Sequence, residues 1–181
     1  SQQASLADDI PLVTMPDIDL KPYMDEDKVN DQLGGVWRFA AAVPVNLTLE
    51  NSGRWESLPN GDRIWRLQIK SPGALSTNLL YEEFFLPKDA TLHIYRPDKK
   101  QVLGAFTAAN NKIDRVFATA LLRGESLVLE YYEPLSVQGQ GVIHIGTFNH
   151  GYRGYGEDNA STGNSGDCTN DVNCSTDPTW Q

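Results

Sequence analysis

Apolar and polar residues alternate along most of this chain, and a period of two residues is typical of strands with one buried face. The clearest example is the stretch 63–70, in which Trp65, Leu67 and Ile69 are separated by polar residues. The stretch 91–95 alternates in the same way. A helix would need apolar residues three or four positions apart, so both patterns predict strands.

Turn sequences rich in proline, glycine and asparagine separate these short alternating runs. Pro59-Asn60-Gly61-Asp62 predicts a hairpin turn, because the Asn-Gly pair tolerates positive φ. Glu82 and Glu83 interrupt an alternating run, which indicates a bulge or the end of a strand. Eight or nine such strands without a convincing helix predict an all-β chain, an antiparallel β-sandwich of jelly-roll type.

Two arms of different composition flank the sandwich predicted for residues 34–148. Residues 1–33 hold eight acidic residues, two lysines and prolines at positions 11, 16 and 22. Prolines restrict the backbone to extended conformations, so we expect an extended acidic arm that lies against the sandwich or a partner, with a short helical turn at residues 25–32. Residues 149–181 are rich in glycine, asparagine, serine and aspartate without periodicity, which indicates an irregular linker or tail.

Charge and hydropathy exclude some functions. The 181 residues have a net charge of −9 and no clustered basic surface is visible, which argues against nucleic-acid binding. No apolar run approaches the roughly 20 residues of a membrane-spanning helix. A secretion signal is not visible, so we expect that it has been removed or lies outside this sequence.

Catalytic and metal-binding patterns are not evident in the sequence. No serine lies in a Gly-x-Ser-x-Gly or Gly-Asp-Ser-Gly-Gly context, so we expect no catalytic triad, no catalytic residue and no cofactor in this chain. His93 is expected to be a surface residue of a strand, whereas His150 lies in a glycine-hinged loop where a functional contact is more plausible. Cys168 and Cys174 are spaced too widely for a usual zinc site, and we favour disulfide bonds, with each other or with cysteines elsewhere.

Exposed aromatic residues provide an alternative function. Tyr95, Tyr132 and Trp55 are the aromatic residues that the strand pattern leaves outside the core, and together they would form a platform for stacking sugars. The alternative hypothesis is therefore a non-catalytic β-sandwich module that binds a glycan or a cell-surface partner.

Several segments resemble the N-terminal pro-region of secreted bacterial trypsin-like serine endopeptidases of the lysyl endopeptidase group. They are residues 78–87, 92–95, 102–107 and 127–134, followed by the His-Gly-Tyr-Arg-Gly segment 150–154. The Ser-Gly-x-Cys-x-x-Asp-Val-x-Cys segment 165–174 is similar to the start of the mature protease in that family. The resemblance spans about residues 34–181.

The resemblance implies a secreted prodomain that assists the folding of a protease domain on the same polypeptide, inhibits it, or does both. It implies that Cys168 and Cys174 bond to cysteines of a protease domain beyond Gln181, which would contain the catalytic residues. We expect His150, Tyr152 and Arg153 to make the docking contact with that domain, with Arg153 pairing bidentately with a carboxylate.

Overall fold

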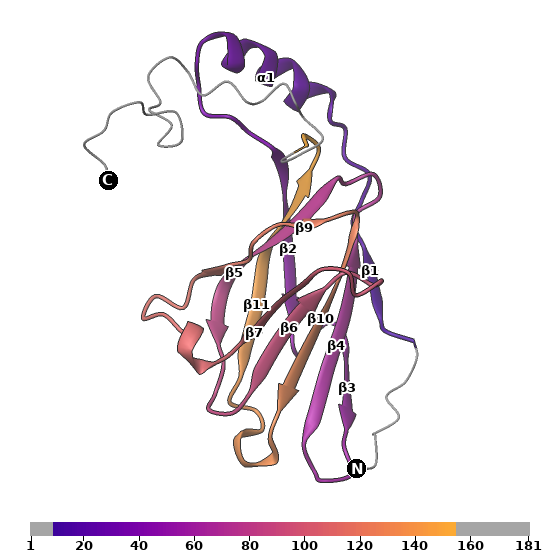
Figure 1. Cartoon of the computed structure of the whole chain (residues 1–181), viewed down its shortest axis with the longest axis vertical. Coiled ribbons are helices and arrows are strands. Elements are labelled where there is room, and N and C mark those ends of the chain that lie inside the picture. Colours follow the sequence, from indigo (N-terminus) through magenta and orange to yellow (C-terminus); the bar gives the residue numbers. More distant parts are fainter. Residues whose placement is uncertain (1–8, 155–181) are drawn as a thin grey trace, which may run out of the picture.

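The structure is a computed structural model that describes residues 9–154. Within this range the chain forms eleven β-strands, one α-helix and two short 3-10 helices, and the helix lies at one end of the long axis (Figure 1). The strands are β1 (Leu12–Thr14), β2 (Ala40–Thr48), β3 (Arg54–Ser57), β4 (Arg63–Lys70), β5 (Ser76–Phe85), β6 (Thr91–Tyr95), β7 (Val102–Phe106), β8 (Phe117–Ala118), β9 (Leu122–Arg123), β10 (Ser126–Glu133) and β11 (Val142–Gly151). The helix is α1 (Lys21–Gln32), and the 3-10 helices are η1 (Ala108–Asn110) and η2 (Leu135–Val137).

The strands form two sheets. Sheet A has the order β1-β4-β10-β6-β7, with β3 also pairing with β4, and sheet B has the order β2-β11-β5-β8, with β9 also pairing with β5. The described pairs are antiparallel except β1 and β4, which are parallel, with Leu12 opposite Gln68. The all-β prediction is confirmed, the β1–β4 pair departs from a purely antiparallel sandwich, and the jelly-roll type stays a prediction.

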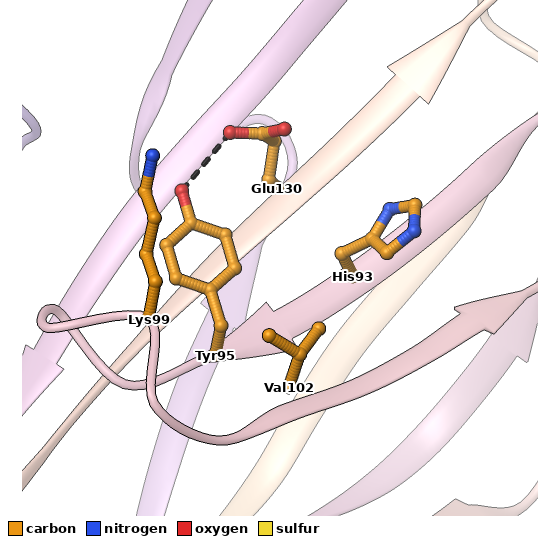
Figure 2. A pocket seen from close by; sticks show the side chains of 5 residues that line it. All are labelled: His93, Tyr95, Lys99, Val102 and Glu130. Carbon is orange, nitrogen blue, oxygen red and sulfur yellow. Dashed lines mark hydrogen bonds between the residues drawn. The ribbon is translucent and has the colours of Figure 1, made fainter.

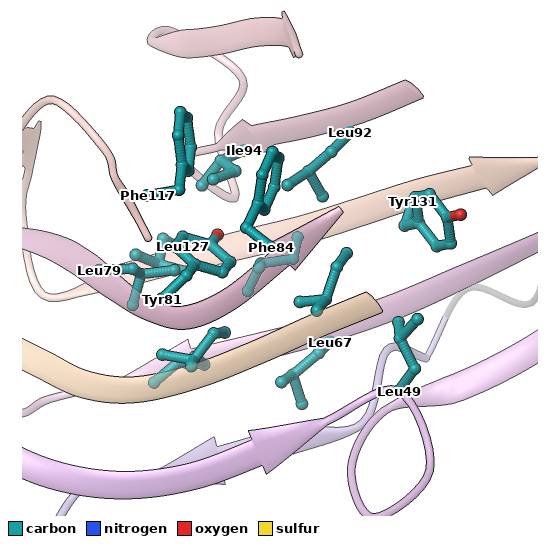
Figure 3. Close-up of a cluster of buried hydrophobic side chains, with 14 of the residues drawn as sticks. Leu49, Leu67, Leu79, Tyr81, Phe84, Leu92, Ile94, Phe117, Leu127 and Tyr131 are labelled. Carbon is teal, nitrogen blue, oxygen red and sulfur yellow. The ribbon is translucent and has the colours of Figure 1, made fainter. Parts of the chain in front are cut away.

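One hydrophobic cluster fills the space between the sheets (Figure 3). Trp65, Leu67 and Ile69, the apolar face predicted for the stretch 63–70, are fully buried. Burying a side chain of this size stabilises a fold by about 1.5–3 kcal/mol. Other fully or nearly fully buried members are Leu79, Tyr81, Phe84, Leu86, Leu92, Ile94, Leu127, Leu129, Tyr131, Ile143, Ile145 and Phe148.

The turn between β3 and β4 is a three-residue loop, Pro59-Asn60-Gly61. The Leu58 N–H donates to the Asp62 carbonyl oxygen at 2.8 Å, which closes the loop. Gly61 has a φ of +88°, a conformation that side-chain-bearing residues rarely adopt. The predicted hairpin is confirmed, and its register places Trp55 directly opposite Trp65.

The pairing of β5 with β11 contains two irregularities. The register skips Glu82 on β5 and Gly146 on β11, so each strand has one extra residue there. A Cβ atom at position 146 would collide with the Glu82 side chain, which explains why glycine fits. The interruption predicted at the two adjacent glutamates is therefore a bulge.

In the first part of the chain, residues 12–14 form the extended strand β1, which lies against the sandwich as predicted, whereas residues 21–32 form the helix α1, longer than the predicted turn at residues 25–32. Pro22 lies in the first turn of α1, where a missing N–H costs no intrahelical hydrogen bond. Proline there is compatible with a helix, so the prediction of an extended backbone is wrong for residues 21–24, where Pro22 was treated as a helix breaker.

Strand β11 continues to Gly151, beyond the expected end of the last strand at Phe148. His150 is consequently a strand residue, paired with Thr77 on one side and Ala41 on the other, and not part of a loop. Residues 155–181 lie outside the described residues. The predictions about the irregular tail and about Cys168 and Cys174 fall there.

Candidate functional site

The candidate docking site lies where β11 ends and meets α1. We call it the exit cluster, and it consists of Asp27, Asp31, Arg38, Tyr152 and Arg153. The Tyr152 hydroxyl donates to Asp27 Oδ2 at 2.6 Å, and Arg38 Nε donates to Asp27 Oδ1 at 2.9 Å. Arg153 Nη2 donates to Asp31 Oδ2 at 2.7 Å. The cluster therefore joins the helix to the end of the last strand.

Main-chain and aromatic contacts hold the same junction. The Phe39 carbonyl oxygen accepts hydrogen bonds from the N–H groups of Tyr152 and Arg153, at 3.0 and 3.2 Å. The Arg153 guanidinium lies over the Trp37 ring, 5.1 Å from its centroid. Tyr23 of α1 contacts the Tyr152 ring, with centroids 6.0 Å apart. The residues that precede β2 thus form part of the junction.

Asp27 is the buried centre of the exit cluster, since it is the only buried residue of α1 and is 5% exposed. A buried carboxylate needs a counter-charge or several hydrogen bonds, because desolvation disfavours its charge. Arg38 provides the charge, and its Nε also donates to the Tyr152 hydroxyl at 3.1 Å. A chain of hydrogen bonds thus leads from Arg38 through the Tyr152 hydroxyl to Asp27.

The electrostatics of the cluster favour one protonation pattern. Burial raises the pKa of the Tyr152 phenol, and its hydrogen bond to Asp27 acts in the same direction. The hydrogen bond to Asp31 raises the pKa of Arg153. Burial opposes the charge of Arg38, but hydrogen bonds to Glu26, Tyr152 and Asp27 outweigh it and raise the pKa of Arg38. Tyr152 therefore remains a neutral donor and both arginines remain cations at neutral pH.

His150 lies apart from this cluster, inside the sandwich. It is 3% exposed, and its Nδ1 lies 2.7 Å from the Oγ of Ser71, which is fully buried. Nε2 is buried and has no hydrogen-bond partner among the residues that the structure describes. Burial lowers the pKa of His150. The serine–histidine contact is closed to solvent, so we assign it a structural role at the end of the core.

The structure brings together two of the three predicted docking residues. Tyr152 and Arg153 belong to the exit cluster, whereas His150 faces the core. Arg153 does meet a carboxylate through both terminal nitrogens, but that carboxylate is Asp31 of its own chain. The docking role of Tyr152 and Arg153 stays a prediction.

The three aromatic residues predicted to form a sugar platform do not share a face. Trp55 lies on the core side of sheet A, where its Nε1 donates to the Leu49 carbonyl oxygen at 3.2 Å and its ring packs on Tyr131. Tyr95 and Tyr132 lie on the outer face of the same sheet, since their neighbours Ile94 and Tyr131 are fully buried. The platform as predicted is wrong in its inclusion of Trp55.

The sequence interpretation missed Asp27 and Arg38, the two residues that hold the exit cluster together. Asp27 lies in an acidic run that reads as a solvated surface. Its partners are 11 and 125 positions away, and no local pattern connects them. A weak signal was present, because Tyr23 and Asp27 lie four residues apart and so share one face of a helix.

Other kinds of site find little support among residues 9–154. No group of three or more histidine, cysteine, aspartate or glutamate side chains in this range is arranged to hold a metal ion. The helices in the same range lack the length and apolar character needed to cross a bilayer. No protein-family model matches the chain.

Proposed function

We propose that this chain is the non-catalytic pro-region of a secreted trypsin-like serine endopeptidase, and that it assists folding of the protease domain or inhibits it. The proposal rests on the resemblance of segments 78–87, 92–95, 102–107, 127–134 and 150–154 to such pro-regions. The first four segments supply β5, β6, β7 and β10. The last one contains the end of β11.

The observation that carries the proposal is the anchoring of segment 150–154. Tyr152 and Arg153 are tied to the Phe39 carbonyl oxygen, and their side chains to Asp27 and Asp31 of α1. The start of the predicted linker is therefore held in a fixed position against the sandwich. Linking two domains on one polypeptide raises the effective concentration of their surfaces for each other.

The physical effect of such a pro-region is a shift in the folding equilibrium of its partner. A domain that binds the folded protease but not its unfolded chain stabilises the folded protease. The stabilisation is about 2.7 kcal/mol when the concentration of the binding domain is 100 times the dissociation constant. The same contact inhibits the enzyme where it covers the substrate cleft. Folding assistance and inhibition are thus two readouts of one interaction.

The test is a refolding experiment in trans, with the denatured protease domain of the same polypeptide. We expect the intact chain to increase the yield of active protease and to reduce its activity when added in excess. Asp27→Asn loosens α1 from β11 and should weaken both effects. Glu50→Gln, which changes an exposed residue in the turn after β2, is the matched control and should retain them.

Two results would reject the proposal. One is a reading frame that encodes no trypsin-like domain with its histidine, aspartate and serine. The other is a chain that, over a range of concentrations, changes neither the refolding yield nor the activity of the protease.

A further inference from the structure

A pocket of about 250 Å³ opens on the outer face of sheet A, and its wall comes from four separate elements (Figure 2). Strand β6 contributes His93 and Tyr95, the following turn Lys99, strand β7 Val102 and strand β10 Glu130. The core lies on the other side of the sheet. The pocket therefore belongs neither to the core nor to the exit cluster.

Strand register and one tight turn position the five side chains. Glu130 lies opposite His93, and Val102 lies opposite Tyr95. The Tyr95 hydroxyl donates to Glu130 Oε2 at 3.0 Å, which orients the ring across the strands (Figure 2). Lys99 has a φ of +57°, an unfavourable conformation for a side-chain-bearing residue, at the turn that brings it beside the pocket.

The pocket differs from the rest of this face in its spare hydrogen-bonding capacity. Elsewhere on the face, Gln68 donates to Ser126 and Tyr132 donates to Asp62. Within residues 9–154, by contrast, the side chains of His93 and Lys99 have no hydrogen-bond or ion-pair partner. The second oxygen of Glu130 bonds to none of the other pocket residues (Figure 2).

The combination of surfaces in the pocket selects a ligand class. The Tyr95 ring and Val102 provide an apolar wall, and Glu130, His93 and Lys99 provide an acceptor and donors around it. A bare phosphate or a nucleic-acid backbone is disfavoured, because the Glu130 carboxylate would repel it. A ring with C–H groups on one face and hydroxyl groups around its edge uses every part of the wall.

We propose that this pocket binds one neutral pyranose residue of a glycan. The C–H face of the sugar would pack on Tyr95, and its hydroxyl groups would donate to Glu130 and accept from Lys99. This binding site is independent of the pro-region function.

The test is an NMR titration of the intact chain with methyl glucoside, methyl galactoside and methyl mannoside, followed at the ring signals of His93 and Tyr95. We expect saturable shifts with a millimolar dissociation constant for at least one of the three sugars. Tyr95→Ala should weaken binding about tenfold, since it removes the stacking ring. Tyr95→Phe keeps the ring and should bind within about threefold of the unchanged chain.

Tyr132→Ala is the matched control, because Tyr132 is an outer-face tyrosine of the same sheet that lies outside the pocket. It should leave the affinity unchanged.

If Tyr95→Ala does not fold, as judged from its spectrum, Glu130→Gln and Lys99→Met should each weaken binding several-fold. The proposal is overturned if none of the three sugars gives saturable shifts, or if Tyr132→Ala is as harmful as Tyr95→Ala. Either result leaves the refolding assay unaffected, so the two proposals fail separately.

Discussion

Two buried carboxylates, Glu133 at the end of β10 and Asp27 on α1, are bound in different ways. The arrowhead of β10 and the helix α1 lie at opposite ends of the molecule (Figure 1). Glu133 is the last residue of β10, and its partner Arg63 lies directly opposite it on the neighbouring strand β4. Arg63 Nε donates to Glu133 Oε2 at 2.7 Å. The hydroxyl of Tyr131 and the N–H groups of Gly139 and Gly141 also donate to this carboxylate.

Asp27, in contrast, takes its partners from elements that no strand ladder connects to α1. Arg38 precedes β2, and Tyr152 follows β11. Glu133 therefore closes the sandwich with residues of its own sheet and the following loop, whereas Asp27 attaches a helix to it. The comparison predicts that loss of Glu133 weakens the whole fold and that loss of Asp27 mainly releases α1.

The largest effect is expected for Glu133→Ala. Arg63 would be left as a partly buried charge, and three other donors would lose their acceptor, so the free energy of unfolding should fall by about 3–5 kcal/mol. Urea denaturation of the intact chain measures this loss. Glu133→Gln keeps an acceptor oxygen and should be less harmful.

Glu50→Ala is the control for this measurement, because Glu50 is exposed and an exposed substitution changes stability by about 0.5 kcal/mol or less. Equal losses for Glu50→Ala and Glu133→Ala would show that burial of Glu133 is not the cause.

The second effect is expected for Asp27→Asn, which keeps the size of the side chain and removes its charge. The free energy of unfolding should fall by about 2 kcal/mol, because Arg38 and Tyr152 lose a charged acceptor. Amide hydrogen exchange separates the two ends: the N–H groups of α1 should exchange faster, and those of β4 and β10 should not.

Asp25→Asn is the matched control in the same helix. Asp25 bridges Lys21 and Lys28 on the exposed side of α1, and exposed ion pairs contribute less than about 1 kcal/mol. Unchanged exchange in α1 of the Asp27→Asn chain would contradict the anchoring role of Asp27.

The sequence predicts much of the sandwich but not the face on which Trp55 lies. The alternation identifies the buried face of β4, and the Asn-Gly pair identifies the hairpin. A two-residue turn at Asn60-Gly61 would place Trp55 opposite Arg66 on the outer face. The observed loop has three residues and places it opposite Trp65. One residue in loop length reverses the face of every side chain, and the local sequence does not settle that length.

The contacts within the exit cluster could not be predicted from the sequence, for a different reason. Its residues are far apart in sequence, and their contacts depend on how α1 packs, which local periodicity does not encode. The resemblance did indicate Tyr152 and Arg153, because it pointed to segment 150–154. It did not reveal that these side chains already bind α1. Tertiary contacts between polar residues follow from the completed fold, whereas strand faces follow from a two-residue pattern.

A third, smaller effect concerns His150, whose pKa is lowered by burial from its ordinary value of 6.5. The folded state disfavours the charged imidazole, whereas the unfolded chain takes up the proton near pH 6.5. The free energy of unfolding therefore keeps its full value above pH 6.5 and decreases as the pH falls below it. The loss cannot exceed about 1.4 kcal/mol per pH unit for one proton. Urea denaturation from pH 7.5 to pH 5 should show a slope that His150→Asn reduces. An identical slope in both chains would mean that His150 does not titrate on unfolding.

The smallest effect is expected for Arg153→Ala, although Arg153 has the shortest ion pair of the exit cluster, 2.7 Å from Asp31. The Asp31 side chain is 41% exposed, and solvent screens such a pair, so the pair should contribute less than about 1 kcal/mol to the free energy of unfolding. A double-mutant cycle with Asp31→Ala measures the pair directly. A coupling larger than the Asp27→Asn loss would reverse the order of importance within the cluster. A small coupling means that Arg153 could exchange Asp31 for a carboxylate of the proposed protease domain at little cost, while Asp27 keeps α1 in place.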